Sequence, residues 1–162
     1  MLGIGIIGHG GVGKTVSAKF MYSRFIKKEY LTEYYHLLHP FLSCLRYMDI
    51  SDMSLAKNLE DELLKHVGVE SLLYPYEKFV YDRDPYIMLV DGIHSPEVYK
   101  LLRNQGFYFL RIDPGVKPPT SKVAGLSFMK ATFSIINDGS LSNLYTKLEI
   151  MLHRFLIKHG CD

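Results

Sequence analysis

The chain contains the stretch Gly8-His9-Gly10-Gly11-Val12-Gly13-Lys14-Thr15. It matches the Walker A pattern Gly-x-x-x-x-Gly-Lys-Thr at every fixed position. An apolar, β-branched run at 2–7 precedes it, and a segment at 14–28 with apolar or small side chains at helical spacing follows it. The sequence therefore predicts a strand, a glycine-rich loop and a helix in that order, which is the context that the motif requires.

This loop predicts a site for nucleotide phosphates. Glycines let successive backbone N–H groups converge on an anion, and the amino-terminal end of the next helix adds partial positive charge. Lys14 is expected to reach the β- and γ-phosphates of ATP, and the hydroxyl of Thr15 to ligate Mg²⁺. His9 and Val12 occupy variable positions and are assigned no chemistry of their own. The loop residues expected to contact ATP are Gly8, Gly10, Gly11, Val12, Gly13, Lys14, Thr15 and Val16.

The rest of the chain alternates strand-like and helix-like segments. Pro40 suits the first turn of a helix, and Gly106 suits a helix C-cap. Strands alternating with helices predict an α/β fold of three layers, in which a five-stranded parallel sheet is covered by helices on both faces. Ligands of such sheets bind at the carboxyl ends of the strands. Further strands are expected at 34–38, 86–90, 107–112 and 131–136, and further helices at 41–48, 54–67, 96–104 and 140–158.

Two helical segments carry more detailed expectations. The helix at 54–67 should begin at a Ser51 or Ser54 cap and expose residues 60–62, with Leu55, Leu59, Leu63 and Leu64 facing the core. Segment 70–81 contains Pro75 and is expected to form a short helix and a loop. The tyrosines at 74–86 could stack on a base, but packing over the sheet edge is favoured.

Size and composition limit the function classes. A chain of 162 residues suits one domain over 1–162, and 48% apolar residues exclude a disordered or fibrous protein. The net charge of +2 gives no support for a nucleic-acid partner. Cys44 and Cys161 fit neither a disulfide framework nor a zinc site, so they are expected to be free thiols. No segment suits a signal peptide or a membrane span, so a cytoplasmic protein with no membrane partner is expected.

Polar residues follow three of the predicted strands. Asp91 ends a buried apolar strand, where it either holds Mg²⁺ as a Walker B-like carboxylate or caps the turn at Gly92. The turn Asn137-Asp138-Gly139 follows the last strand, and its spacing alone favours neither a structural nor a functional role. His36, His39 and His94 lie near strand ends, but a lone histidine is more often a surface or core residue than a catalyst.

With these residues in view, the chain resembles the phage-type deoxynucleoside monophosphate kinases, within the P-loop nucleoside monophosphate kinases. The resemblance rests on the Walker A loop, on His39-Pro40-Phe41-Leu42, on Asp91 with Glu97, and on Ile135-Ile136-Asn137-Asp138-Gly139-Ser140-Leu141. It implies a P-loop kinase fold, in which Asn137, Asp138 and Gly139 lie against the donor adenine. It also implies a viral origin, and hence the host cytoplasm.

Such kinases need cations besides Lys14, because the transferred group is highly charged. The family supplies arginines from a mobile lid and from the monophosphate pocket. The reduced lid-like connection here, 113–126, contains no arginine, and its basic residues are Lys117 and Lys122. Arg46, Arg111 and Lys122 are therefore the candidates for charge stabilisation, alongside Lys14 and Asp91 as catalytic residues. Arg83 is expected to be a solvated surface residue.

Three functions remain open at this point. The first is ATP-dependent phosphoryl transfer to a (deoxy)nucleoside monophosphate, which gives the diphosphate. The second is a P-loop kinase with another acceptor, such as dephospho-coenzyme A, a modified nucleotide or a DNA hydroxyl. The third is a degenerate nucleotide-binding protein that acts through a protein partner. The expected ligands are small-molecule nucleotides, and the sequence leaves a homodimer open.

Overall fold

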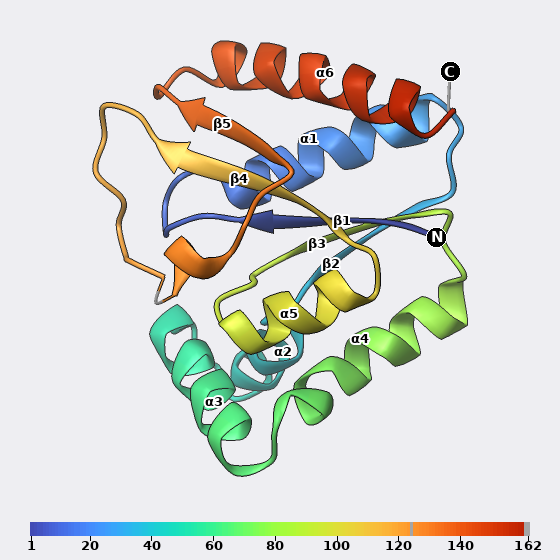
Figure 1. Ribbon diagram of the computed structural model, residues 1–162. Coiled ribbons are helices and arrows are strands. Elements are labelled where there is room, and N and C mark those ends of the chain that lie inside the picture. Colours follow the sequence, from blue (N-terminus) through green and yellow to red (C-terminus); the bar gives the residue numbers. More distant parts are fainter. Residues whose placement is uncertain (124, 161–162) are drawn as a thin grey trace.

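The computed structural model describes residues 1–123 and 125–160. In this part of the chain, five strands form one parallel sheet in the order β2-β3-β1-β4-β5, and Figure 1 shows their arrangement. The predicted five-stranded parallel α/β sheet is therefore confirmed. The strands are β1 (Leu2–Ile7), β2 (Thr32–His36), β3 (Ile87–Asp91), β4 (Tyr108–Pro114) and β5 (Phe133–Asn137).

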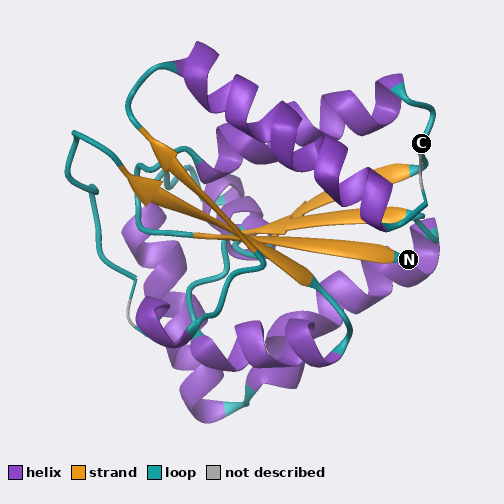
Figure 2. Ribbon diagram, turned by 45° about the horizontal axis from the view of Figure 1, so that its top comes forward, coloured by secondary structure: helices purple, strands orange, loops and turns teal. Residues whose placement is uncertain are grey.

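Helices cover both faces of this sheet (Figures 1 and 2). α1 and α6 lie on one face, where Phe25 and Phe155 are buried against the sheet. α2, α4 and α5 lie on the other face, where Tyr76 and Leu102 are buried. The helices are α1 (Lys14–Lys27), α2 (His39–Tyr47), α3 (Met53–His66), α4 (Val69–Arg83), α5 (Pro96–Asn104) and α6 (Leu141–Lys158), with a 3₁₀ turn, η1 (Leu126–Phe128).

The prediction of a helix and a loop around Pro75 is wrong, because α4 runs without interruption from Val69 to Arg83. A proline inside a helix costs about 3 kcal/mol. Leu73 and Tyr76, which flank it, are 0% and 2% exposed, and burying two large side chains offsets a cost of this size. Long-range packing therefore outweighs the local helix-breaking signal.

The inner face of α3 also differs from the expectation. The helix begins at an Asp52 cap, whose carboxylate accepts hydrogen bonds from the backbone N–H of Ser54 at 2.8 Å and of Leu55 at 3.3 Å. Leu59 is 41% exposed, whereas Glu60 is only 1% exposed. The expected serine cap and the expected exposure of Glu60 are both wrong, because packing against α2 and α4 sets the rotation of α3 about its axis.

Smaller differences concern the ends of elements and the surface. β2 begins and ends two residues before the predicted strand at 34–38, and β5 begins and ends after the predicted one at 131–136. Cys44 is an exposed free thiol, whereas Cys161 lies outside the described residues. None of the helices in the described ranges is both long enough and apolar enough to cross a bilayer.

Candidate functional site

The predicted phosphate-binding loop connects the central strand β1 to the first turn of α1. Gly13 caps α1 in the left-handed region, with φ 96°, and supplies no side-chain cap. At Gly8, where φ is +151°, a Cβ would lie 2.4 Å from the carbonyl oxygen of Ile112, which no backbone adjustment of the loop alone could relieve. Glycine is thus required at both ends of the loop, and the first N–H groups of α1 remain available to an anion.

Lys14 folds back over this loop. Its Nζ donates hydrogen bonds to the carbonyl oxygens of Gly8 at 2.9 Å and His9 at 2.7 Å. Burial lowers the pKa of Lys14 to about 8, the negative charge of Asp91 opposes that shift, and the positive charge of Lys57 adds to it. The ammonium therefore lies against the loop, where the charges of Asp91 from β3 and Lys57 from α3 both act on it.

Asp91 is fully buried at the carboxyl end of β3 and accepts three hydrogen bonds. Thr15 Oγ1 donates to its Oδ2 at 2.9 Å, while the Tyr34 hydroxyl and His36 Nδ1 donate to its Oδ1 at 3.0 Å and 2.5 Å. Burial alone would raise the pKa of Asp91, but the His36 contact, followed by the Thr15 and Tyr34 bonds, lowers it below its usual range. Asp91 is therefore an ionised carboxylate that contacts the loop, which is more than a turn cap at Gly92 requires.

Tyr34 and His36 were not predicted as parts of this site. They lie two residues apart on β2 and so share one face of the strand, and His36 pairs in register with Asp91. Burial, together with the Asp91 charge, raises the pKa of Tyr34, which keeps the phenol protonated as a donor. The sequence signal was the alternation of Tyr34 and His36 at the end of a strand, but the strand order was needed to identify their partner.

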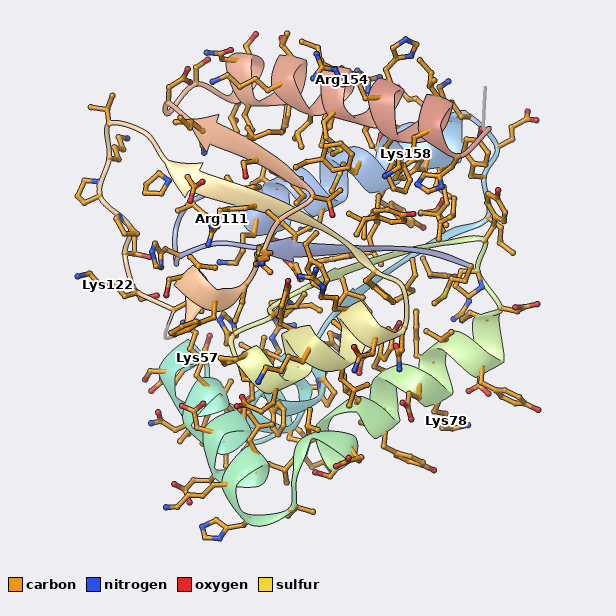
Figure 3. The ribbon with its side chains drawn as sticks, in the orientation of Figure 1. Lys57, Lys78, Arg111, Lys122, Arg154 and Lys158 are labelled. Atoms are coloured by element: carbon orange, nitrogen blue, oxygen red, sulfur yellow. The ribbon has the colours of Figure 1, made fainter. Side chains whose placement is uncertain are left out.

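His94 and Lys57 are further residues that sequence reasoning missed here. The pKa of His94 falls to about 3, through burial first and then through the charges of Lys14, Lys57 and His36. Its imidazole is therefore neutral at physiological pH. Lys57 is half-buried near the amino-terminal end of α3. It lies on the side of the molecule where the strands end (Figure 3).

The lid-like connection after β4 is attached to the phosphate-binding loop. The backbone N–H of Gly10 donates to the Ser121 carbonyl at 2.8 Å, and that of Thr120 donates to the Gly10 carbonyl at 2.9 Å. His9, a variable position of the motif, accepts a hydrogen bond from the backbone N–H of Val123 through Nδ1 at 3.0 Å. Lys122 is exposed within this attached segment (Figure 3).

A cavity of about 200 Å³ lies between the loop, this connection and the end of β5. Asn137 connects the loop to the turn after β5. Its Nδ2 donates to the Val12 carbonyl at 3.0 Å, and its Oδ1 accepts from the N–H of Gly139 at 3.1 Å. Asp138 instead pairs with Lys147 of α6 at 3.2 Å. The lining of the cavity consists of Gly11, Val12, Pro114, Lys117, Pro118, Pro119, Asn137 and Gly139.

Replacing Gly115 by Ala is expected to weaken nucleotide binding about tenfold. A Cβ at Gly115 would lie 2.5 Å from the Asn137 carbonyl oxygen and 2.7 Å from the Asp138 Cα, so two backbone segments that shape the cavity would have to separate. Overpacking of this kind costs about 1 to 3 kcal/mol. Titration calorimetry with ATP measures the effect. Val116→Ala, at a side chain that is 86% exposed in the same connection, is the control, and an unchanged affinity in the Gly115 variant would contradict the prediction.

The arginine candidates are less favourably placed than Lys14 to bind a transferred phosphate. Nη2 of Arg111 donates to the Leu126 carbonyl at 2.5 Å, and its Nε lies 3.8 Å from Asp113. Arg46 is exposed in the last turn of α2, and no contact among the described residues joins it to Lys14 or Asp91. The structure thus brings Lys14, Thr15, Asp91 and Asn137 together, but not Arg46.

Two other residues named from the sequence lie at the surface. Arg83 is 62% exposed and 3.8 Å from Glu33, as expected of a solvated arginine. Glu97 is exposed in the first turn of α5. Among the tyrosines, Tyr76 packs in the core against Tyr35 and Phe107, and Tyr86 precedes β3, at the end of the sheet opposite to Asp91.

Comparison with solved structures identifies the architecture. The chain superimposes on the crystal structure of shikimate kinase from Bacteroides thetaiotaomicron with a TM-score of 0.52, over 95% of this chain and 98% of that chain, at 10% sequence identity. No protein-family model and no curated protein matches the sequence. At this identity the likeness concerns the fold alone, so the chain has the P-loop kinase fold expected from its sequence.

Proposed function

We propose that the protein transfers the γ-phosphoryl group of ATP to a (deoxy)nucleoside monophosphate and so forms the diphosphate. The observation that carries the proposal is the contact between the Thr15 hydroxyl and the buried Asp91 carboxylate, made directly beside Lys14. This contact joins the proposed phosphate-binding loop, which follows β1, to an acid at the end of β3. The acid is of the kind that supports a metal ion.

Mg²⁺ fits this site. Among the described residues, no group of three or more His, Cys, Asp or Glu side chains could hold a metal by itself. Mg²⁺ in phosphoryl-transfer sites needs no such cage, because it takes one or two protein oxygens and completes its shell with phosphate and water. Thr15 would hold it, and Asp91 would orient the Thr15 hydroxyl or bind the ion's water. Bound there, Mg²⁺ would neutralise charge on the phosphates.

The chain's own residues act mainly by positioning. The N–H groups at the start of α1 and the Lys14 ammonium bind the β- and γ-phosphates, for which Lys14 gives up its contacts with the Gly8 and His9 carbonyls. The donor base enters the cavity beside Asn137. An acceptor oxygen then bonds to the γ-phosphorus as the bond to the β,γ-bridging oxygen breaks, and ADP leaves.

The acceptor is the least constrained part of the proposal. The nucleoside monophosphate is favoured by the order and spacing of the sequence blocks shared with the phage-type kinases. The engagement of Arg111 with the Leu126 carbonyl is one observation that favours a different acceptor, or a protein that binds nucleotide without transferring phosphate. An arginine held in this way cannot also form a bidentate contact with a phosphate without rearrangement.

The test is an ADP-release assay with ATP against a panel of deoxynucleoside and ribonucleoside monophosphates, with and without Mg²⁺. We expect release that depends on one acceptor and on the metal, with the diphosphate identified by phosphorus NMR. Turnover on dephospho-coenzyme A or on DNA ends alone would replace the acceptor but keep the kinase. ATP binding without turnover on any acceptor would overturn the proposal and support the partner-binding alternative.

A further inference from the structure

The segment that follows β4 is fixed to the rest of the site at both of its ends. We call residues 115–123 the strap. At its start, the backbone N–H of Gly115 donates to the Asn137 carbonyl at 2.8 Å. Near its other end, Ser121 forms an antiparallel bridge with Gly10, in the predicted phosphate-binding loop. The strap therefore has the attachments of a fixed wall and not those of a hinged lid.

The middle of the strap forms part of the cavity beside Asn137. Five of the lining residues come from the strap and from the loop, and they are Lys117, Pro118, Pro119, Gly11 and Val12. Each proline ring fixes its own φ near −65°, so this stretch of the strap has few alternative conformations. The width of the cavity thus depends on how firmly the strap is held against the loop.

His9 supplies a side-chain anchor for the strap. Val123 is 8% exposed, so its backbone N–H needs a partner within the protein, and His9 Nδ1 accepts from it at 3.0 Å. Because a backbone N–H can only donate, Nδ1 carries no proton in this contact. The bridge at Gly10 joins backbone atoms alone. Among the described residues, the ring of His9 is the one side chain that forms a hydrogen bond between loop and strap.

The ring and the backbone of His9 have different partners. Its carbonyl oxygen accepts from Lys14 Nζ at 2.7 Å, whereas its ring accepts from the strap. Replacing the ring therefore removes the anchor of the strap and leaves the backbone of the loop with its own contacts. Phosphate binding by the loop and the position of the strap can thus be separated by experiment.

We propose that His9 is a positioning residue for the donor nucleotide, because through Val123 it holds the strap as a wall of the cavity for the donor base. The inference rests on the proposed function, which places that base beside Asn137. Loss of the anchor lets the strap move away from the loop and removes part of the surface that contacts the base. A variable position of the Walker A motif then determines how tightly the base is bound, while the fixed positions bind the phosphates.

A matched pair of variants, His9→Leu and His9→Asn, tests the anchor without any ligand. Leu and Asn have nearly the same shape, but only Asn carries an acceptor, Oδ1, at the same number of bonds from the backbone as Nδ1. In His9→Leu we expect the Val123 amide to exchange with deuterium at least tenfold faster, measured by NMR. His9→Asn should keep most of the protection, and His153→Leu, at an exposed histidine of α6, is the control. Equal protection in His9→Leu and wild type would overturn the anchor.

Two probes then test the role of His9 in nucleotide binding. A non-hydrolysable ATP analogue and inorganic tripolyphosphate, which has no base, are each titrated calorimetrically in the presence of Mg²⁺. His9→Leu should bind the analogue about tenfold more weakly and tripolyphosphate within twofold of wild type. His9→Asn should recover most of the affinity for the analogue, and His153→Leu should match wild type with both probes.

The possible results separate this inference from the kinase proposal. An equal loss of both probes in His9→Leu would show that His9 supports the loop itself, and tighter binding of the analogue would show that the strap obstructs the site. Either result would overturn the proposal. Failure of wild type to bind the analogue would overturn both this inference and the proposed function. A loss confined to the analogue, without turnover on any acceptor, would uphold the role of His9 and count against phosphoryl transfer alone.

Discussion

Replacing Lys14 by Met is expected to lower kcat for phosphoryl transfer about 100- to 1,000-fold while the protein stays folded. The Lys14 ammonium is the charged donor closest to the loop, within 2.9 Å of two of its carbonyl oxygens. Charge that builds up on the γ-phosphoryl in the transition state would lose its main protein partner, and a methionine of similar length contributes no compensating charge. Steady-state ADP release measures the effect.

Lys27→Met is the matched control, because Lys27 is exposed in the last turn of the same helix, far from the loop. It should leave kcat and the KM for ATP unchanged. Thermal unfolding of both variants checks that the fold persists, because the Lys14→Met variant also loses two hydrogen bonds to the loop. A Lys14→Met protein with wild-type turnover would show that the loop does not perform the chemistry.

Wild-type protein is expected to lose about 2 to 4 kcal/mol of stability between pH 5 and pH 8.5 through the buried carboxyl of Glu60. Burial, with a smaller contribution from Asp61, raises the pKa of Glu60 from 4.5 to about 8. Between these two values the folded protein keeps a proton that the unfolded chain has released. Folding therefore becomes less favourable as the pH rises, because ionising Glu60 requires a charge in a site where both oxygens lack a hydrogen-bond partner among the described residues.

Urea unfolding at both pH values, on wild type and on Glu60→Gln, measures this contribution. The variant cannot ionise, so it should match wild type within about 1 kcal/mol at pH 5 and exceed it by about 2 to 4 kcal/mol at pH 8.5. The exposed acid Glu77 supplies the control, and Glu77→Gln should follow the wild-type pH dependence. If wild type and Glu60→Gln depend on pH equally, Glu60 titrates as an ordinary surface acid and its burial is not maintained in solution.

The donor half of the site was largely predictable from the sequence. The phosphate site proposed at Gly8 to Thr15 depends on consecutive backbone N–H groups, so the local order of residues is sufficient to predict it. Asp91 was identifiable because a carboxylate at the end of a buried strand needs a partner. Its partners Tyr34 and His36 were not, because only the pairing of β2 with β3 brings them to Asp91.

The acceptor half was not predictable in the same way. Arg46 and Arg111 were chosen by charge and position along the chain, and the structure directs one toward solvent and the other to a backbone carbonyl. Which side chains of α3 face water depends on the rotation of the helix, which its neighbours α2 and α4 determine.

The sequence by itself determined the phosphate-binding loop, the alternation of strands and helices, and the parallel sheet. These follow from local backbone chemistry and from short-range periodicity, which eight to fifteen consecutive residues contain. Only the tertiary structure decided that Pro75 stays helical, that Glu60 is buried, and that Tyr34 and His36 contact Asp91. Each of these depends on packing between segments distant in the chain, where burial of side chains outweighs the local preference of the residue.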